Sequence, residues 1–364
     1  MRMLYDKFGV TLCDTKRATP GYTLFSPLWQ SMTYIINMEG EVVHQWDWKG
    51  RANAYGRLLP EGDLLWGEAH YADYKGNVKT GIRQVDWEGN ILWSYFDTTQ
   101  HHDFRRLKNG NFIYIGLEEL PDDAARRVQG GLLGSELDGG KIKSDYLREV
   151  TPEGETVWEW HTHVDFDIEK YVVCPLCPRG DYLHINSIAE TVEGGIMISC
   201  RHINLIAVID KMTNKFKWEY QNLDFGHQHD FHQLENGNYM IFANGAHTTR
   251  SNALGGSQVI EINPKNKEHV WTYKGSPPHT FNSRHISGAQ RLATGNTLIC
   301  EGISGRIFEV TPEGDVVWNY ISPYFSSAEI EGPAGNQNMV FRALRYDANS
   351  PEISGRLNPD AYKK

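Results

Sequence analysis

The sequence predicts an all-β protein, a single six-bladed β-propeller, on three observations. A strand pattern that contains tryptophan recurs six times, glycine turns open strands within most of the repeats, and the last apolar segment has no strand partner close to it in the sequence. Repetition at a period of about 40 to 50 residues is typical of propellers, whose blades are four-stranded sheets of one design.

The first signal is a turn followed by an alternating apolar strand. The turn is Glu-Gly in four of the copies, and the tryptophans are Trp46, Trp93, Trp158, Trp218, Trp271 and Trp318. Their spacings of 47, 65, 60, 53 and 47 residues each leave room for one four-stranded unit with its loops. A two-sheet sandwich does not repeat one four-strand signature in this way, so we expect six blades.

The second signal is a glycine turn between two apolar runs. It occurs at Gly62, Gly110, Gly194, Gly237 and Gly295, twice as Asn-Gly. Asn-Gly favours a hairpin because both residues accept a positive φ angle. Each repeat is therefore interpreted as a four-stranded meander.

The third signal concerns the ends of the chain. We interpret residues 1–364 as one domain, with residues 1–29 as an N-terminal extension. The repeats begin with a third and fourth strand, Tyr34 to Trp46, and end with a lone first strand, Met339 to Arg345. We expect this last segment to pair with N-terminal strands, which removes an exposed sheet edge. The long insertion 118–145 is expected to fold as a lid over the channel mouth.

Composition limits the function classes. The net charge is −10 and no long run of like charge occurs, which argues against nucleic acid as a partner. Residues 1–20 contain no apolar signal-peptide core and no stretch of 18 apolar residues occurs, so we expect a cytoplasmic protein with no membrane partner. Five cysteines argue against a disulfide framework. Nothing in the sequence indicates an oligomeric state.

Histidines recur near the start of the first strand in successive repeats. Ten residues before the turn glycine stand His184, His227 and His285, and eight residues before it stand His102 and His229. Side chains alternate along a strand, so both offsets are predicted to share one face. The polar residues expected around them at one channel mouth are His101, Arg201, Arg284 and Glu301.

Three interpretations of this cluster are open. Each histidine could cap the backbone of a neighbouring blade, or several could hold Zn, Cu or Fe. An adjacent arginine such as Arg201 disfavours a cation, however, and cations beside neutral imidazoles suit an anionic substrate. We therefore predict an anion site with no metal and no cofactor.

Four pieces of the sequence carry a resemblance to a known family. They are His101-His102-Asp103 followed by Leu-x-Asn-Gly-Asn, Leu183-His184-Ile-Asn-Ser187 followed by Ile198-Ser-x-Arg201-His202, the pair Gln228-His229, and Ser283-Arg284. Over about residues 30–346 the chain resembles the bacterial arylsulfotransferases, which take sulfate from phenolic esters rather than from the nucleotide donor.

The resemblance implies a sulfotransferase that moves a sulfuryl group from a phenolic sulfate ester to an acceptor phenol. It makes His229 the nucleophile, which would carry the group as a sulfohistidine, and predicts ping-pong kinetics. His102, His184 and Arg201 would bind the sulfuryl and phenol oxygens. The further substrate-binding residues would be His101, His227, Arg284, His285 and Glu301. Candidate aromatic walls for the phenol are Tyr55, Phe104, Tyr182 and Phe281.

The sequence departs from the family in two places. Secreted members carry a signal peptide and an N-terminal β-domain, which are not found here. The unit Cys174-Pro-Leu-Cys177 could be a redox dithiol, half of a metal site or an inert loop. A second Cys-x-x-Cys is missing, which argues against a four-thiolate zinc site but leaves mixed Cys/His coordination open. We expect free thiols.

Two other functions compete with sulfuryl transfer. The same channel could support a metal-dependent hydrolase or lyase that acts on an aromatic or anionic small molecule. Alternatively, the propeller could be a non-catalytic interaction module, which needs no polar cluster of this kind.

Overall fold

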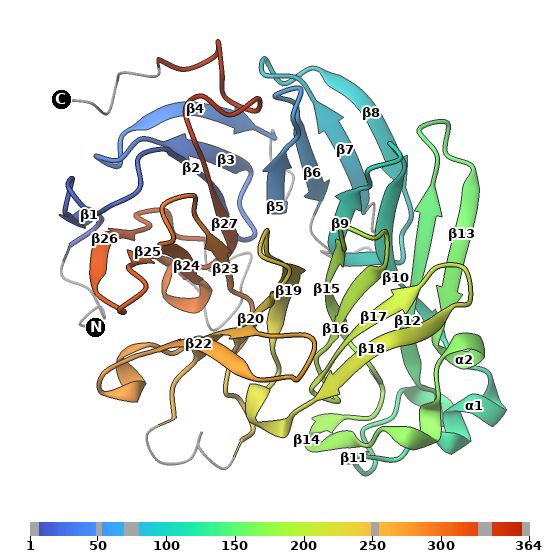
Figure 1. Cartoon of the computed structure of the whole chain (residues 1–364). Coiled ribbons are helices and arrows are strands. Elements are labelled where there is room, and N and C mark those ends of the chain that lie inside the picture. Colours follow the sequence, from blue (N-terminus) through green and yellow to red (C-terminus); the bar gives the residue numbers. More distant parts are fainter. Residues whose placement is uncertain (1–6, 49–52, 69–79, 249–254, 327–336, 359–364) are drawn as a thin grey trace. The chain divides into compact units, whose positions relative to one another are not determined.

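The computed structural model describes residues 7–48, 53–68, 80–248, 255–326 and 337–358. The chain divides into two compact units, Met1–Phe96 with Ile286–Lys364, and Asp97–His285. Within the described residues, each unit contains three antiparallel sheets of four or five strands (Figure 1). The fold is a six-bladed β-propeller, as the repeats predict.

In the second unit, three sheets follow one another along the chain. The first is formed by β9 (Gln100–Arg106), β10 (Phe112–Glu119), β12 (Lys143–Val150) and β13 (Thr156–His161). The next is formed by β15 (Ile185–Glu190), β16 (Ile196–Cys200), β17 (Leu205–Asp210) and β18 (Lys215–Gln221). The last is formed by β19 (His229–Gln233), β20 (Tyr239–Ala243), β21 (Gln258–Ile262) and β22 (His269–Lys274).

In the first unit, one sheet joins the two ends of the chain. It is formed by β27 (Val340–Tyr346), β2 (Tyr22–Pro27), β3 (Met32–Ile36) and β4 (Val42–Asp47). A second sheet is formed by β5 (Asn53–Leu58), β6 (Leu64–Glu68), β7 (Gly81–Val85) and β8 (Ile91–Phe96). The third is formed by β23 (Gly288–Arg291), β24 (Thr297–Glu301), β25 (Arg306–Val310), β26 (Val316–Ile321) and β1 (Gly9–Cys13). Tyr346 of β27 lies opposite Tyr22 of β2, so the expected closure is confirmed.

The segment that we expected as an N-terminal extension contributes to two sheets. β2 is the second strand of its sheet, and β1 adds a fifth strand to β26. Every residue of β2 is buried, so it lacks the polar and apolar alternation that marks a half-exposed strand. This is why the sequence pattern did not identify it.

The six repeated tryptophans all lie in the last strand of their sheets, in β4, β8, β13, β18, β22 and β26. Where their contacts are described, the indole donates a hydrogen bond to a carbonyl of the next sheet. Trp46 donates to Asp86, Trp158 to Lys211, Trp218 to Pro264, and Trp318 to Met38. The repeated tryptophans therefore link neighbouring blades through hydrogen bonds.

The apolar core lies between neighbouring sheets. In one cluster Met197 and Val208 of the β15–β18 sheet pack with Phe231 and Ile241 of the β19–β22 sheet. The hairpin glycines have the predicted positive φ angles, for example +88° at Gly110 and +84° at Gly237.

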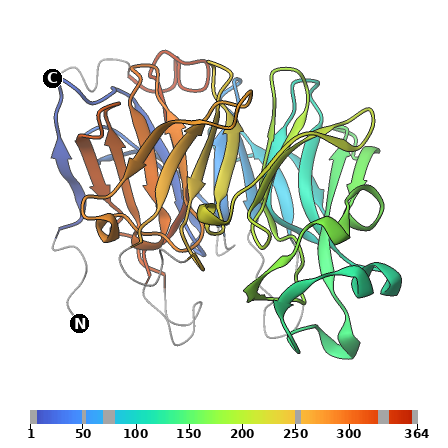
Figure 2. The same cartoon turned by 60° about the horizontal axis from the view of Figure 1, so that its bottom comes forward.

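The insertion 118–145 is built around the β10–β12 hairpin, which continues to Glu119 opposite Lys143. It contains α1 (Asp122–Arg127), β11 (Gly130–Leu132) and η1 (Asp138–Gly140). β11 pairs in parallel with β14 (Val173–Pro178), which follows α2 (Thr162–Asp165) and η2 (Ile168–Lys170). Figure 2 shows this part extending beyond the sheets of the second unit. A lid function remains a prediction.

The remaining short helices are η3 (Leu223–Phe225), η5 (Pro278–Thr280) and η6 (Gly302–Ser304). Among the described residues, none of the helices has the length and apolar character needed to cross a membrane.

Candidate active site

The first strands of the three sheets in the second unit are neighbours: β15 contacts β9 on one side and β19 on the other. Each pairs with its second strand through a β-bulge near its start. The register shifts between His101 and Phe104, between Ile185 and Ser187, and between His229 and His232. Bulges re-aim side chains and are frequent next to active sites.

Several residues beside these bulges have backbone angles that only glycine adopts easily. The φ angle is 53° at His102, 52° at His184, 67° at His227 and 56° at Asp230. Each such conformation costs about 1–3 kcal/mol and persists only where the surroundings enforce it. Strained residues recur near the start of the first strand in all three blades of this unit, which indicates a built site.

Buried polar side chains fix the three strands to one another. Asp103 of β9 accepts a hydrogen bond from the backbone N–H of Ile188 at 3.0 Å, and Ser187 accepts one from Phe231 N–H at 3.0 Å. The Gln228 side chain donates to the carbonyls of Cys200 and Leu205. The motif residues Asp103, Ser187 and Gln228 thus hold the scaffold rigid.

The imidazoles form a continuous row. Ring centroids are 4.9 Å apart for His101 and His102, 4.7 Å for His102 and His184, and 4.6 Å for His184 and His202. The row continues from His202 to His227 at 6.0 Å and on to His247 at 4.4 Å. The structure therefore brings histidines of all three blades together.

His229 is held in one tautomer. Its Nδ1 lies 2.7 Å from Asn244 Oδ1 and 3.0 Å from the carbonyl oxygen of His227. Asn244 Nδ2 donates to the Ser283 carbonyl, so its Oδ1 must accept. Both neighbours are acceptors, which places the proton on Nδ1 of His229 and the lone pair on Nε2.

Two carboxylates orient other imidazoles. His184 Nδ1 donates a hydrogen bond to the Asp181 carboxylate, and His101 Nε2 lies 3.0 Å from Asp145 Oδ1. His101 Nδ1 is in turn 2.6 Å from His102 Nδ1. Asp145 and Asp181 therefore orient His101 and His184 in the row.

Arg201 has an unusual environment. Its guanidinium is partly buried, and within the described part of the chain it makes no hydrogen bond and no ion pair. Burial lowers the pKa of Arg201, and the nearby Cys177, Asp181 and Cys174 oppose this effect. The side chain still carries a full positive charge at neutral pH because a guanidinium is not deprotonated in proteins.

Burial keeps most of the imidazoles neutral. It lowers the pKa of His102 and of His229 well below the usual value, and the charges of His184 and Arg201 add to this effect. Burial also lowers the pKa of His202 to about 3. Burial alone would raise the pKa of Asp181, but His184 and His202 hold it below its ordinary value. The site thus combines the fixed charge of Arg201 with the neutral rings of His102, His202 and His229.

The remaining predicted site residues, His285, His227 and Glu301, do not share one environment. Part of the His285 side chain is exposed to solvent. The protein atoms around its ring still remove enough water to lower the pKa of His285, and the charges of Arg201 and Arg284 lower it further. His227 is fully buried, with Nε2 3.3 Å from Cys177 Sγ rather than beside His229. Glu301 belongs to the other unit, where it pairs with Arg306 at 3.2 Å.

Two expectations are corrected. The four candidate aromatic walls, Tyr55, Phe104, Tyr182 and Phe281, are buried in the core with at most 1% of their surface exposed, so they cannot line an open pocket. The prediction that both histidine offsets share one face fails at His227, because this residue lies before β19 begins and its positive φ angle interrupts the alternation of an extended strand.

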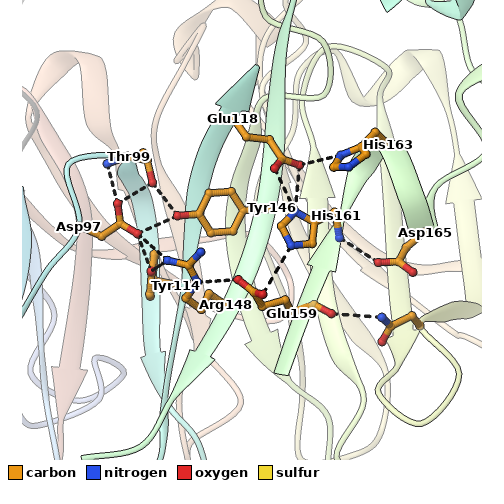
Figure 3. A network of polar contacts seen from close by, with 11 residues as sticks. Asp97, Thr99, Tyr114, Glu118, Tyr146, Arg148, Glu159, His161, His163 and Asp165 are labelled. Atoms are coloured by element: carbon orange, nitrogen blue, oxygen red, sulfur yellow. Dashed lines mark hydrogen bonds and ion pairs between the residues drawn. The ribbon is translucent and has the colours of Figure 1, made fainter. Parts of the chain in front are cut away.

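Other features of the second unit lie apart from the row. A cavity of about 630 Å³ is lined by outer-strand residues such as Lys215 and Trp218 and by none of the predicted site residues. A polar network crosses the β9–β13 sheet (Figure 3), in which Tyr114 and Tyr146 donate to Asp97 and Arg148 bridges Asp97 to Glu159.

The model of the family described as arylsulfotransferase (ASST) matches residues 82–323. This chain belongs to the arylsulfotransferase family. The matched region contains every described site residue of the histidine row, which supports the resemblance inferred from the motifs.

More distant similarities concern the fold. A protein of unknown function from Bacteroides caccae has a TM-score of 0.56 and 13% identity, over 90% of this arylsulfotransferase family member and 99% of that chain. An inactive virginiamycin B lyase from Staphylococcus aureus with quinupristin has a TM-score of 0.49 and 13% identity, over 86% and 83% of the two chains, which is too remote to bear on the reaction.

One curated protein shares a short segment. An alignment 97 residues long, which covers 24% of this chain, shows 33% identity to a microbial collagenase of Vibrio parahaemolyticus. This chain spans only 12% of that protein's length, so the similarity does not extend the collagenase activity to the arylsulfotransferase family member.

Sequence reasoning missed four residues of the site: Asp145, Asp181, Asn244 as a partner of His229, and His247. Asp181 stands three residues before His184, a spacing that a turn can bring together, so its proximity was a usable signal. His247 lies 70 residues after Cys177, and no local pattern connects them.

Proposed function

We propose that this protein transfers a sulfuryl group from an aryl sulfate ester to an acceptor phenol, with His229 as the nucleophile. The observation that carries the proposal is the Arg201 guanidinium, which has no hydrogen-bond or ion-pair partner among the described residues and lies within electrostatic range of His102 and His229. A fixed cation among neutral imidazoles favours an anion that bears transferable oxygens. Membership of the arylsulfotransferase family supports this reaction class.

In the first half-reaction, the Nε2 lone pair of His229 attacks the sulfur of the aryl sulfate. The N–S bond forms as the S–O bond to the aryl group breaks, and the electron pair leaves with the phenol oxygen. The hydrogen bonds that Nδ1–H donates to Asn244 Oδ1 and to the His227 carbonyl hold the ring and stabilise the positive charge that the ring gains. Arg201 and His102 bind the sulfuryl oxygens.

The phenol oxygen needs a proton as it departs. His184, oriented by the Asp181 carboxylate, supplies it from Nε2. In the second half-reaction the acceptor phenol returns its proton to His184 and attacks the sulfur, and the S–N bond breaks. The sum exchanges one phenol for another on the sulfuryl group, and no metal, cofactor or water is consumed.

The proposal includes the substrate class and the location of the protein. Donor and acceptor are small phenolic compounds, and the protein acts in the cytoplasm. Fractionation of the native host, followed by detection of the protein in the cytosolic or the periplasmic fraction, tests the location.

The reaction is tested with 4-nitrophenyl sulfate as the donor and phenol as the acceptor. We expect nitrophenol release that requires the acceptor, and a mass increase of one sulfuryl group on the His229 peptide when the acceptor is omitted. His229→Ala abolishes both signals. His269→Ala, which removes an exposed histidine of the outer strand β22, leaves both unchanged.

Two results contradict the proposal. Equal turnover by the wild type and His229→Ala excludes His229 as the nucleophile. Nitrophenol release that does not depend on the acceptor, with inorganic sulfate as the product, identifies a hydrolase instead.

A further inference from the structure

A second cluster of reactive side chains lies at the end of the histidine row. It consists of Cys174, Cys177, His227 and His247, and each contributes one ligand atom within 4.8 Å of the others. The cysteines come from β14, His227 precedes β19 and His247 follows β20. The proposed sulfuryl transfer uses none of these four side chains.

We propose that these four residues form a structural zinc site. Two thiolates and two imidazoles are a ligand set typical of tetrahedral Zn²⁺, and four protein ligands leave no open position for catalysis.

The distances match a tetrahedron. Zn–S bonds of about 2.3 Å and Zn–N bonds of about 2.0–2.1 Å place sulfur and nitrogen ligands about 3.6 Å apart. The Sγ atoms of Cys174 and Cys177 both lie 3.6 Å from His247 Nδ1. Cys177 Sγ lies 3.3 Å from His227 Nε2. The ligand atoms are therefore already spaced for one ion.

The surroundings allow the site to be filled. Cys177 and His227 are buried, Cys174 is partly buried and His247 is exposed, so an ion can enter from the solvent side. The backbone of His227 is fixed by a hydrogen bond of 2.7 Å from its N–H to Asn204 Oδ1. His227 and His247 both have positive φ angles, 67° and 57°, and each ring contributes a ligand atom to the cluster.

Charge balance connects this site to Arg201. Two thiolates neutralise the two charges of Zn²⁺, so the loaded site is neutral. Without the ion, a thiolate of Cys174 or Cys177 would interact with Arg201, which lies within electrostatic range of both. A bound zinc ion therefore leaves the positive charge of Arg201 available to an anion. It also ties β14 to the segment that leads into His229.

The site is tested on the full chain with metal ions alone. We expect stoichiometric zinc by elemental analysis of protein purified without chelator. After reduction with a phosphine and removal of zinc, titration with Co²⁺ should produce the thiolate charge-transfer and visible bands of a tetrahedral cobalt site, and added Zn²⁺ should remove them.

Matched variants assign the ligands. Cys174→Ser and His247→Ala replace the two ligands that reach the surface, so these variants are expected to fold. They should weaken Co²⁺ binding by more than the roughly 10–100-fold that loss of an outer-shell partner causes. Cys13→Ser and His269→Ala serve as controls and should bind as the wild type does.

The proposal is overturned if reduced wild-type protein binds no Co²⁺, or if Cys174→Ser and His247→Ala bind it as tightly as the controls. The result is independent of the sulfuryl-transfer proposal. His229→Ala should keep its cobalt spectrum while it loses transfer, and a protein that binds zinc but transfers no sulfuryl group overturns only the other proposal.

Discussion

Nδ1 of His184 donates a hydrogen bond to the carboxylate of Asp181, three residues earlier in the chain. The carboxylate fixes the orientation of the ring. In the proposed reaction, Asp181 is therefore a positioning residue for the group that delivers a proton to the departing phenol.

Replacement of Asp181 by Asn should lower kcat/KM, and the loss should depend on the donor. General acid catalysis contributes about 10²–10⁴-fold, and it matters most for poor leaving groups. We expect Asp181→Asn to slow transfer from phenyl sulfate far more than transfer from 4-nitrophenyl sulfate. Asp167→Asn, at an exposed position of the same segment, should change neither rate. An equal loss with both donors would mean that Asp181 has only a structural role.

Replacement of Arg201 by Gln should weaken anion binding. Hydrogen bonds to charged groups contribute about 1.5–3 kcal/mol, which corresponds to a roughly 10–150-fold rise in the inhibition constant for inorganic sulfate. Arg201→Lys should have an intermediate effect, because a lysine keeps the charge but lacks the planar fork. Arg126→Gln, in exposed α1, is the control. An unchanged inhibition constant for Arg201→Gln would place the anion elsewhere.

The network in Figure 3 predicts part of the acid sensitivity of the protein. Burial would raise the pKa of Asp97, but hydrogen bonds from Tyr114, Thr99 and Tyr146 outweigh it and lower the pKa. A lowered carboxyl pKa contributes stability above the unfolded value of about 3.9, and this stability is lost as the pH falls toward the folded value. Wild-type Tm should therefore drop more steeply below about pH 5 than the Tm of Asp97→Asn.

Thermal melts of both proteins at a series of pH values test this prediction. Asp97→Asn should be less stable than the wild type at neutral pH, and the difference should shrink on acidification. Asp138→Asn, which removes an exposed carboxylate, should follow the wild-type curve. A constant difference at all pH values would exclude Asp97 as a titrating group in unfolding.

The tryptophan ties should contribute to stability. Trp158 Nε1 donates to the Lys211 carbonyl at 3.2 Å and to Asn214 Oδ1 at 2.8 Å. Trp158→Phe should lower the free energy of unfolding by about 1–3 kcal/mol, because it leaves these acceptors without their donor. Trp87→Phe removes a partly buried indole that makes no described hydrogen bond and should cost less. Urea unfolding of both variants shows whether the lost stability comes from the hydrogen bonds of the indole or from the packing of the ring.

The blade count could be predicted because each signal is local. A hairpin glycine shapes a turn within its own repeat, and the tryptophan of the last strand bonds to a turn of the next repeat. The spacing of these residues along the sequence therefore indicates the number of blades. Strand β1 could not be predicted in this way. It pairs with β26 across nearly the whole chain, and its own burial pattern shows no regular alternation.

The candidate site was only partly predictable for a related reason. Matched offsets brought His102, His184 and His229 to attention because the blades repeat the same bulged strand. The direction of each ring depends on backbone angles that no repeat encodes, as His227 shows. The partners Asn244 and Asp145 come from other strands, so only the folded structure reveals them.

The pairing of β27 with β2 has a consequence for synthesis of the protein. β2 leaves the ribosome long before its partner β27 is synthesised. Until then the nascent sheet exposes an unpaired strand edge, which is a template for aggregation. Synthesis of β27 should therefore be the step at which this sheet becomes complete, and a ribosome stalled before Val340 should leave a product that chaperones retain.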